Sequence, residues 1–112
     1  MVLIKSIADE MGIPPYSIYA ATKAAACSYA RSWAAELAPR GIQVNVVAPG
    51  LTDTAMMAAV PEEKRAALIA PISLGRMACP DEIASAKLFL LRDGTSFITG
   101  TELSVDGGMR QV

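Results

Sequence analysis

Short apolar runs alternate along the chain with longer stretches of helical character. The runs at 2–4 and 42–47 show little polar alternation and predict buried strands of the parallel type, and a third strand is expected at 102–105. Pro49-Gly50 and Asp106-Gly-Gly end the second and third runs. Each interval between the runs is long enough for a crossover helix, which parallel pairing requires.

The longest helical stretch, residues 17–38, is rich in alanine and ends at Pro39 and Gly41. Shorter helices are expected at 54–59 and 61–70, the second with a proline at its start. A further amphipathic helix is expected at 81–91, with acidic residues in its first turn, where the helix dipole favours them. The order of these elements, βαβαβ, predicts an α/β fold with a parallel sheet.

Three strands and two main helices would make an incomplete sheet. Parallel sheets are normally covered by helices on both faces. The first strand also starts at residue 2, with no preceding element to pair beside it. We therefore expect either a partner chain that completes the sheet or a larger domain of which residues 1–112 are one part.

Composition excludes several classes of function. A net charge of −1 and a pI near 5.3 argue against a nucleic-acid partner, and no apolar run is long enough to span a membrane. The absence of histidine excludes serine–histidine triads and histidine metal sites. Two cysteines are too few for a secreted disulfide framework, and charged residues interrupt the apolar start before it could form a signal core. We expect a cytoplasmic protein without a metal.

Tyr19 and Lys23 are the sharpest local feature of the chain. They stand four residues apart on the long helix, so their side chains share one face. An ammonium close to a phenol favours its ionised form, which lets a tyrosine act as a general acid or base near neutral pH. Taken alone, this spacing is more typical of a solvated surface pair than of a catalytic one.

Two further features fall at the same edge of the predicted sheet. Ser6 directly follows the first strand, and Pro49-Gly50 follows the second. Open α/β sheets bind their ligands at the carboxyl ends of the strands. The convergence of these segments with the start of the Tyr19 helix predicts a site, although Ser6 could instead simply cap a turn.

With these residues in place, the sequence resembles the short-chain dehydrogenase/reductase family along its whole length. The motifs that carry the resemblance are Ser6 thirteen residues before Tyr19, Tyr19-Ala-Ala-Thr-Lys23, Val44-Asn-Val-Val-Ala-Pro-Gly-Leu-Thr-Asp-Thr54, Pro80-Asp-Glu-Ile-Ala84 and Ile98-Thr-Gly-Thr-Glu-Leu-Ser-Val-Asp-Gly-Gly108. Each motif is weak alone, but five in family order at family spacing are specific. Sugar-nucleotide epimerases share the Tyr-x-x-x-Lys motif but usually carry a larger domain after it.

The resemblance implies a hydride transfer between NAD or NADP and a small carbonyl or alcohol substrate. Tyr19 would be the general acid/base, Lys23 would favour its phenolate and bind the nicotinamide ribose, and Ser6 would hold the substrate oxygen. The implied cofactor contacts are those of Tyr19, Lys23, Pro49, Gly50, Thr52 and Thr54. Thr52 and Thr54 could equally be helix N-caps.

The family's first half is missing from the sequence. No Gly-x-x-x-Gly-x-Gly or Gly-x-Gly-x-x-Gly turn for the cofactor pyrophosphate occurs in the chain. We therefore expect residues 1–112 to be the C-terminal, catalytic half of a Rossmann-like domain. The alternative is a truncated, non-catalytic remnant or a partner that co-assembles with intact relatives. Lys5 is a smaller departure, because the family commonly has a small or hydroxyl residue before the serine.

Three further expectations concern the surroundings of the site. Residues 51–75 would form a substrate lid whose methionines suit an adaptable apolar pocket. Asp9 and Glu10 are most simply a solvated pair of loop charges. The full-length form is expected to be a homo-oligomer, because the family's subunit contacts lie largely on the Tyr19 helix and the last helix and strand. A small-residue face with Ala24, Ala30 and Ala34 would permit close helix approach.

Overall fold

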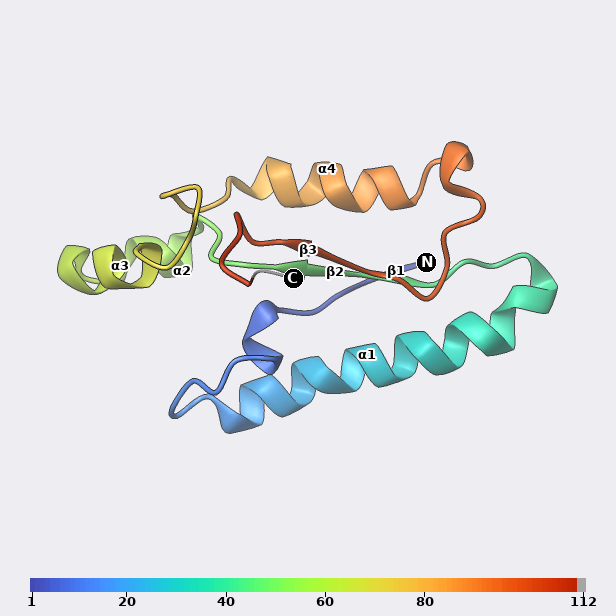
Figure 1. Ribbon diagram of the computed structural model, residues 1–112, viewed down its shortest axis with the longest axis horizontal. Coiled ribbons are helices and arrows are strands. Elements are labelled where there is room, and N and C mark those ends of the chain that lie inside the picture. Colours follow the sequence, from blue (N-terminus) through green and yellow to red (C-terminus); the bar gives the residue numbers. More distant parts are fainter. Residues whose placement is uncertain (111–112) are drawn as a thin grey trace.

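The computed structural model describes residues 1–110, in which three strands form one parallel sheet in the order β1-β2-β3. These are β1 (Val2–Ile4), β2 (Asn45–Pro49) and β3 (Glu102–Val105). The sheet lies between two helices, with α1 against one face and α4 against the other (Figure 1). The α/β class and the parallel sheet are as predicted.

The second strand begins three residues later than predicted. Gln43 and Val44 are bound to the loop that precedes β3, because the Val44 N–H donates to the Thr99 hydroxyl at 3.1 Å and the Gln43 amide donates to the Ile98 carbonyl at 2.7 Å. The strand continues to Pro49, which pairs with Val105. Proline is tolerated at this last position because no further ladder bond needs its missing N–H.

Helix α1 (Ser17–Leu37) runs along one face of the sheet and passes into a short 3-10 helix, η2 (Ala38–Arg40), that ends at Gly41. Ala30 and Ala34 are buried against the sheet, in a cluster with valines of the second strand segment. Ala24 is exposed instead. The expected small-residue face is therefore corrected, because Ala30 and Ala34 belong to the core and not to a surface shared with Ala24.

Helix α4 (Pro80–Leu90) covers β2 and β3 from the other side. Its first turn is capped as the acidic residues suggested, because the Glu82 carboxylate accepts the Cys79 N–H at 2.8 Å. Leu90 is buried at its other end, where η3 (Asp93–Thr95) follows. No helix within residues 1–110 is long and apolar enough to cross a membrane.

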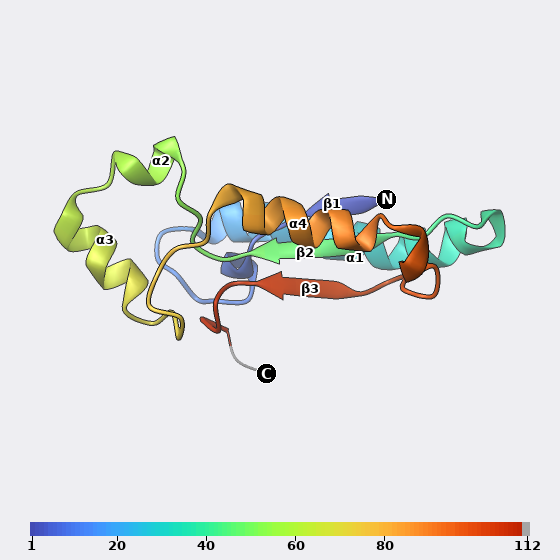
Figure 2. The same cartoon turned by 90° about the horizontal axis from the view of Figure 1, so that it is seen from above.

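The two short helices of the 51–75 segment, α2 (Ala55–Ala58) and α3 (Glu62–Ile69), project beyond the carboxyl ends of the strands (Figure 2). The segment is anchored at both ends. Thr52 forms an isolated bridge with Ala78, and the Leu74 N–H donates to the Gly107 carbonyl at 3.0 Å.

The outer edge of β1 pairs with no strand in the described part of the chain. Met1 and Ile4 are 48% and 43% exposed there, although both are large and apolar. A parallel sheet with an apolar open edge is incomplete, as the strand count predicted.

Candidate active site

A cleft of about 360 Å³ opens at the carboxyl ends of β1 and β2. The structure brings six of the seven sequence-predicted site residues together in its lining: Ser6, Tyr19, Pro49, Gly50, Thr52 and Thr54. They come from three segments, because both strands end at this edge and α1 begins beside it. This is the position at which α/β sheets place ligands.

Ser6 follows β1 and is the N-cap of a 3-10 turn, η1 (Ile7–Asp9). Its backbone is extended, and its Oγ accepts the Ala8 N–H at 3.2 Å. Ser6 therefore does cap a turn, as the alternative predicted. The same residue also lines the cleft. Its proton is donated to no group within residues 1–110, which leaves it available to a ligand oxygen.

Tyr19 stands on the first turn of α1 with its side chain 44% exposed at the cleft. The ammonium of Lys23 lies over the Tyr19 ring, 5.6 Å from its centroid, so the predicted shared helix face is confirmed. Lys23 itself does not line the cleft. Among the described residues it makes no hydrogen bond or ion pair, and its charge is held only against the aromatic face.

Gly50 lies where β2 leaves the sheet. A Cβ at this position would stand 2.8 Å from the Cα and Cβ of Asp106, closer than carbon atoms approach. Its N–H donates to the Val105 carbonyl at 3.0 Å. The absence of a side chain therefore has a structural cause, the close approach of the end of β3, besides any role toward a ligand.

The two threonines of the site differ in what their hydroxyls do. Thr52 donates its hydroxyl to the Gly50 carbonyl at 3.1 Å and caps no helix. Thr54 occupies the N-cap position of α2, but its side chain makes no capping bond. The Thr54 hydroxyl has no hydrogen-bond partner in the part of the chain that the structure describes, so it remains available at the cleft.

Most of the remaining cleft wall is apolar and comes from three regions. These are the loop before α1, the short helices α2 and α3, and the C-terminal segment, with Met11, Ile13, Met56, Met57, Leu68 and Met109. Met56 is 82% exposed. The 51–75 segment therefore supplies loosely packed apolar side chains to the cleft, and the sequence did not indicate the contribution of Met109.

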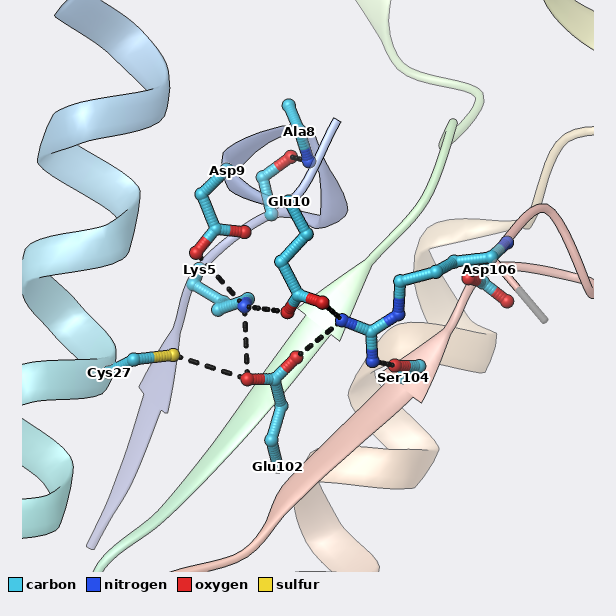
Figure 3. A network of polar contacts seen from close by, with 10 residues as sticks. Lys5, Ala8, Asp9, Glu10, Cys27, Glu102, Ser104 and Asp106 are labelled. Carbon is cyan, nitrogen blue, oxygen red and sulfur yellow. Dashed lines mark hydrogen bonds and ion pairs between the residues drawn. The ribbon is translucent and has the colours of Figure 1, made fainter. Parts of the chain in front are cut away.

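A buried ionic cluster adjoins the site, and the sequence did not predict it (Figure 3). The Lys5 ammonium bonds Asp9 at 3.0 Å, Glu10 at 2.7 Å and Glu102 at 2.9 Å, and only 1% of its side chain is exposed. The Asp9 side chain is 4% exposed. The expectation of a solvated Asp9–Glu10 pair is therefore wrong for Asp9, whereas the Glu10 side chain is 41% exposed although it is ion-paired. The available signal was a lysine at the end of a buried strand, followed four and five residues later by acids.

The cluster continues to the C-terminal segment. Arg110 pairs with Glu10 and with Glu102, and its guanidinium also donates to the Ser104 hydroxyl at 2.5 Å. Hydrogen bonds from Lys5, and secondarily from Arg110, lower the pKa of Glu10 to about 2. Burial alone would lower the pKa of Lys5, but its three carboxylate partners outweigh burial and raise it.

Comparison with known proteins identifies a family for the whole described chain. The family profile described as Enoyl-(Acyl carrier protein) reductase matches residues 1–110. The chain is 44% identical over 112 residues to 3-oxoacyl-[acyl-carrier-protein] reductase FabG of Salmonella typhimurium, which covers all of this chain and 46% of that protein. It is 40% identical over 109 residues to the FabG protein of Thermotoga maritima, 97% of this chain and 44% of that one.

A relative of a different name matches over the same extent. The chain is 42% identical over 112 residues to cis-4-hydroxycyclohexanecarboxylate dehydrogenase of Sinomonas cyclohexanicum, covering all of this chain and 45% of that protein. The chain thus spans about half the length of the curated relatives that it matches.

Proposed function

The chain belongs to the short-chain dehydrogenase/reductase family, and from this premise we propose that it is the catalytic half of an NAD(P)-dependent oxidoreductase. The reaction is hydride transfer between nicotinamide and the carbon of a carbonyl or alcohol, with Tyr19 as general acid/base. The observation that carries the proposal is the single cleft that Ser6 and Tyr19 share at the carboxyl end of the sheet. Residues 1–112 form one partial Rossmann-like domain with its lid at about 51–75.

The residues present fit the nicotinamide end of such a cofactor. Lys23 and Thr54 each have a hydrogen-bonding group with no bonded partner within residues 1–110. Gly50 has no side chain, so a ligand in the cleft can approach its backbone closely. Pro49 and Thr52 lie on either side of Gly50 and would shape the same contact. When bound, the nicotinamide would supply or accept the hydride. The pyrophosphate-binding glycine turn is not in this sequence.

The hydroxyls of Ser6 and Tyr19 would have different roles at the substrate oxygen. The Ser6 hydroxyl, with its oxygen held by the Ala8 N–H, would donate a hydrogen bond to the carbonyl oxygen and stabilise the developing charge. Tyr19 would deliver the proton that completes the alcohol, or accept it in the reverse direction. Lys23, over the Tyr19 ring, would stabilise the phenolate that remains.

The cleft wall indicates an apolar substrate. Four methionines in the lining are flexible and polarisable, and they can adapt to different apolar groups. The names of two relatives indicate their substrates. A 3-oxoacyl-[acyl-carrier-protein] reductase acts on a carbonyl, and a cis-4-hydroxycyclohexanecarboxylate dehydrogenase acts on an alcohol. We propose that the active protein is a cytoplasmic homo-oligomer, a dimer or tetramer, acting on a small molecule of one of these two classes.

The test is the loss of one hydroxyl in the protein that carries a cofactor-binding half ahead of residue 1. Tyr19→Phe should lower kcat for reduction of a 3-oxoacyl thioester by about 100-fold or more, measured by NADPH absorbance. Tyr29→Phe is the matched control, because Tyr29 is 55% exposed on the same helix and stacks on Trp33 away from the cleft. Turnover above a tenth of the parent in Tyr19→Phe would refute the assignment.

The alternative, a remnant or co-assembly partner without activity of its own, makes a different prediction about assembly with relatives. The 112-residue chain alone should show no saturable binding of NADH or NADPH in calorimetry under either hypothesis. With an intact relative added, a co-assembly partner should appear in a mixed oligomer by native mass spectrometry. Tight NADPH binding by the chain alone would contradict the expectation that cofactor binding requires the glycine-rich half that this sequence lacks.

A further inference from the structure

The buried Lys5 lies immediately before Ser6 and borders the same cleft, but its ammonium is bonded on the α1 side of the sheet. Strand side chains alternate between faces, so Lys5 lies on the same side of the sheet as Leu3, which packs against the α1 core. The thiol of Cys27, on α1, bonds the same Glu102 oxygen that Lys5 contacts. The Lys5 ammonium therefore lies between α1 and the sheet. By the alternation of side chains along an extended backbone, the side chain of Ser6 points to the other side.

The register of the sheet explains how Lys5 reaches a strand two positions away. Ile4 pairs with Val47, so the next residues in register are Lys5 and Ala48, and Ala48 pairs with Ser104. The Lys5 N–H donates to the Val47 carbonyl at 3.0 Å, which extends this pairing. Because Ala48 has only a methyl group and is fully buried, the Lys5 side chain can cross β2 to reach Glu102 on β3.

Lys5 also closes the turn that carries Ser6. Ser6 is the N-cap of η1, Asp9 is the last residue of η1, and Glu10 caps its end. Lys5 directly precedes the N-cap and bonds both acids at the other end of the turn, so its side chain links the start of the turn to its end. Within residues 1–110, Lys5 is the sole side-chain partner of Asp9, and the second Asp9 oxygen is buried without any partner.

Removing Lys5 would leave three adjacent carboxylates, of which Asp9 is buried and would have no counter-charge. An uncompensated buried charge is strongly unfavourable, and we expect the turn to open so that water reaches it. The Ala8 N–H, which fixes the Ser6 oxygen, belongs to that turn. Opening the turn would therefore displace the Ser6 hydroxyl at the edge of the cleft.

We propose that Lys5 is a positioning residue for Ser6: its ion pairs tie β1, η1 and β3 together and hold the serine hydroxyl where the substrate oxygen binds. The inference deepens the proposed function and rests on it. It assigns a role to a lysine at a position where the family commonly has a small or hydroxyl residue. Asp9, Glu10 and Glu102 are then the three ion-pair partners through which Lys5 holds the turn.

The first measurement is amide hydrogen exchange by mass spectrometry on the 112-residue chain. In Lys5→Met, the segment with Ala8, Asp9 and Glu10 should exchange at least ten times faster than in the parent, while β2 stays protected. Lys87→Met is the control, because Lys87 is exposed on α4, across the sheet. Equal protection of the turn in Lys5→Met and the parent would overturn the proposal.

The second measurement separates positioning from stability in the protein with its cofactor-binding half. Lys5→Met should lower kcat at least tenfold and leave the Kd for NADPH within twofold. The double variant Lys5→Met with Asp9→Leu removes the orphaned carboxylate, so the turn should close again, and both stability and kcat should recover toward the parent. Stability that recovers while kcat stays low would refute the proposal, because the turn would then be closed without restoring the reaction.

Failure of the proposed function gives a different pattern. If the parent protein itself shows no turnover with 3-oxoacyl thioesters or cyclic secondary alcohols, the oxidoreductase assignment fails. The exchange experiment then still decides whether Lys5 holds the turn. Should Lys5→Met fail to fold, Glu10→Gln is the gentler variant, because its side chain is 41% exposed, and its turn should still exchange faster than that of Lys87→Met.

Discussion

Replacing Gly50 by alanine places a methyl group against the end of β3. The new Cβ would stand 2.8 Å from the Cα and Cβ of Asp106, where ordinary contact begins at 3.4 Å. Asp106 cannot turn away, because it is buried and its carboxylate accepts the N–H groups of Gly108 and Arg110 at 3.0 Å each. The ends of β2 and β3 must therefore separate by about 0.6 Å.

The expected cost follows from two opposing effects. Overpacking of this kind costs about 1–3 kcal/mol, and a glycine-to-alanine change returns about 0.4–1 kcal/mol by restricting the unfolded chain. Gly50→Ala should therefore lower the free energy of unfolding by about 1–2 kcal/mol. Gly12→Ala is the matched control, since nothing lies within 4 Å of its added Cβ and its φ is not positive.

Urea unfolding followed by circular dichroism measures both variants against the parent chain. Gly12→Ala should stay within about 0.5 kcal/mol of the parent or exceed it. If Gly50→Ala is as stable as Gly12→Ala within that margin, the close approach of β3 is not what requires glycine at this position. The reason would then have to be sought on the ligand side of the cleft.

Three further predictions concern the core, the thiols and pH. Asn45→Ala strips a buried amide from a carbonyl and an N–H of the loop before β3, and urea unfolding should show a loss of about 2 kcal/mol or more; a loss below about 0.5 would contradict this. Burial, with help from a neighbouring carboxylate, raises the pKa of Cys27, so iodoacetamide should label the exposed Cys79 first by mass spectrometry. Because Lys5 and Arg110 lower the pKa of Glu10 to about 2, its stabilising effect is present above about pH 4.5 and lost as pH falls toward 2. Melting curves of Glu10→Gln and the parent should thus differ at pH 7 and converge near pH 2; a constant difference would count against the ion pairs.

Local pattern predicted most of the fold. The strands at 2–4 and 102–105 appear with the bounds that were expected, and the long helix differs by one residue at its end. The second strand shifted because apolarity does not reveal which backbone groups are already bonded. Val44 is fully buried and apolar, yet its N–H is taken by Thr99, fifty-five residues later in the chain.

The candidate site was predictable for a different reason from the cluster behind it. Ser6, Tyr19 and Gly50 meet because consecutive parallel strands end at one edge, which depends on element order alone. The bond between Lys5 and Glu102 joins residues 97 positions apart and depends on strand register and on the small side chain between them. Neither the register nor the small side chain between the strands can be inferred from the charges along the sequence. For that reason the sequence predicted a solvated pair for Asp9 and Glu10.

The alternation of side chains at the end of β1 makes the two neighbourhoods separable by experiment. Ser6 has an extended backbone, and the Lys5 ammonium lies toward α1 in its ion pairs, so we expect Lys5 to act on the site through the turn. Lys5 variants should then lower turnover equally for large and small substrates. Variants of the apolar wall, such as Met57→Ala, should change the ratio between those substrates, because they alter the space that the substrate fills. An effect of Lys5 on substrate size would show that its side chain itself bounds the space that the substrate fills, and would contradict a role through the turn.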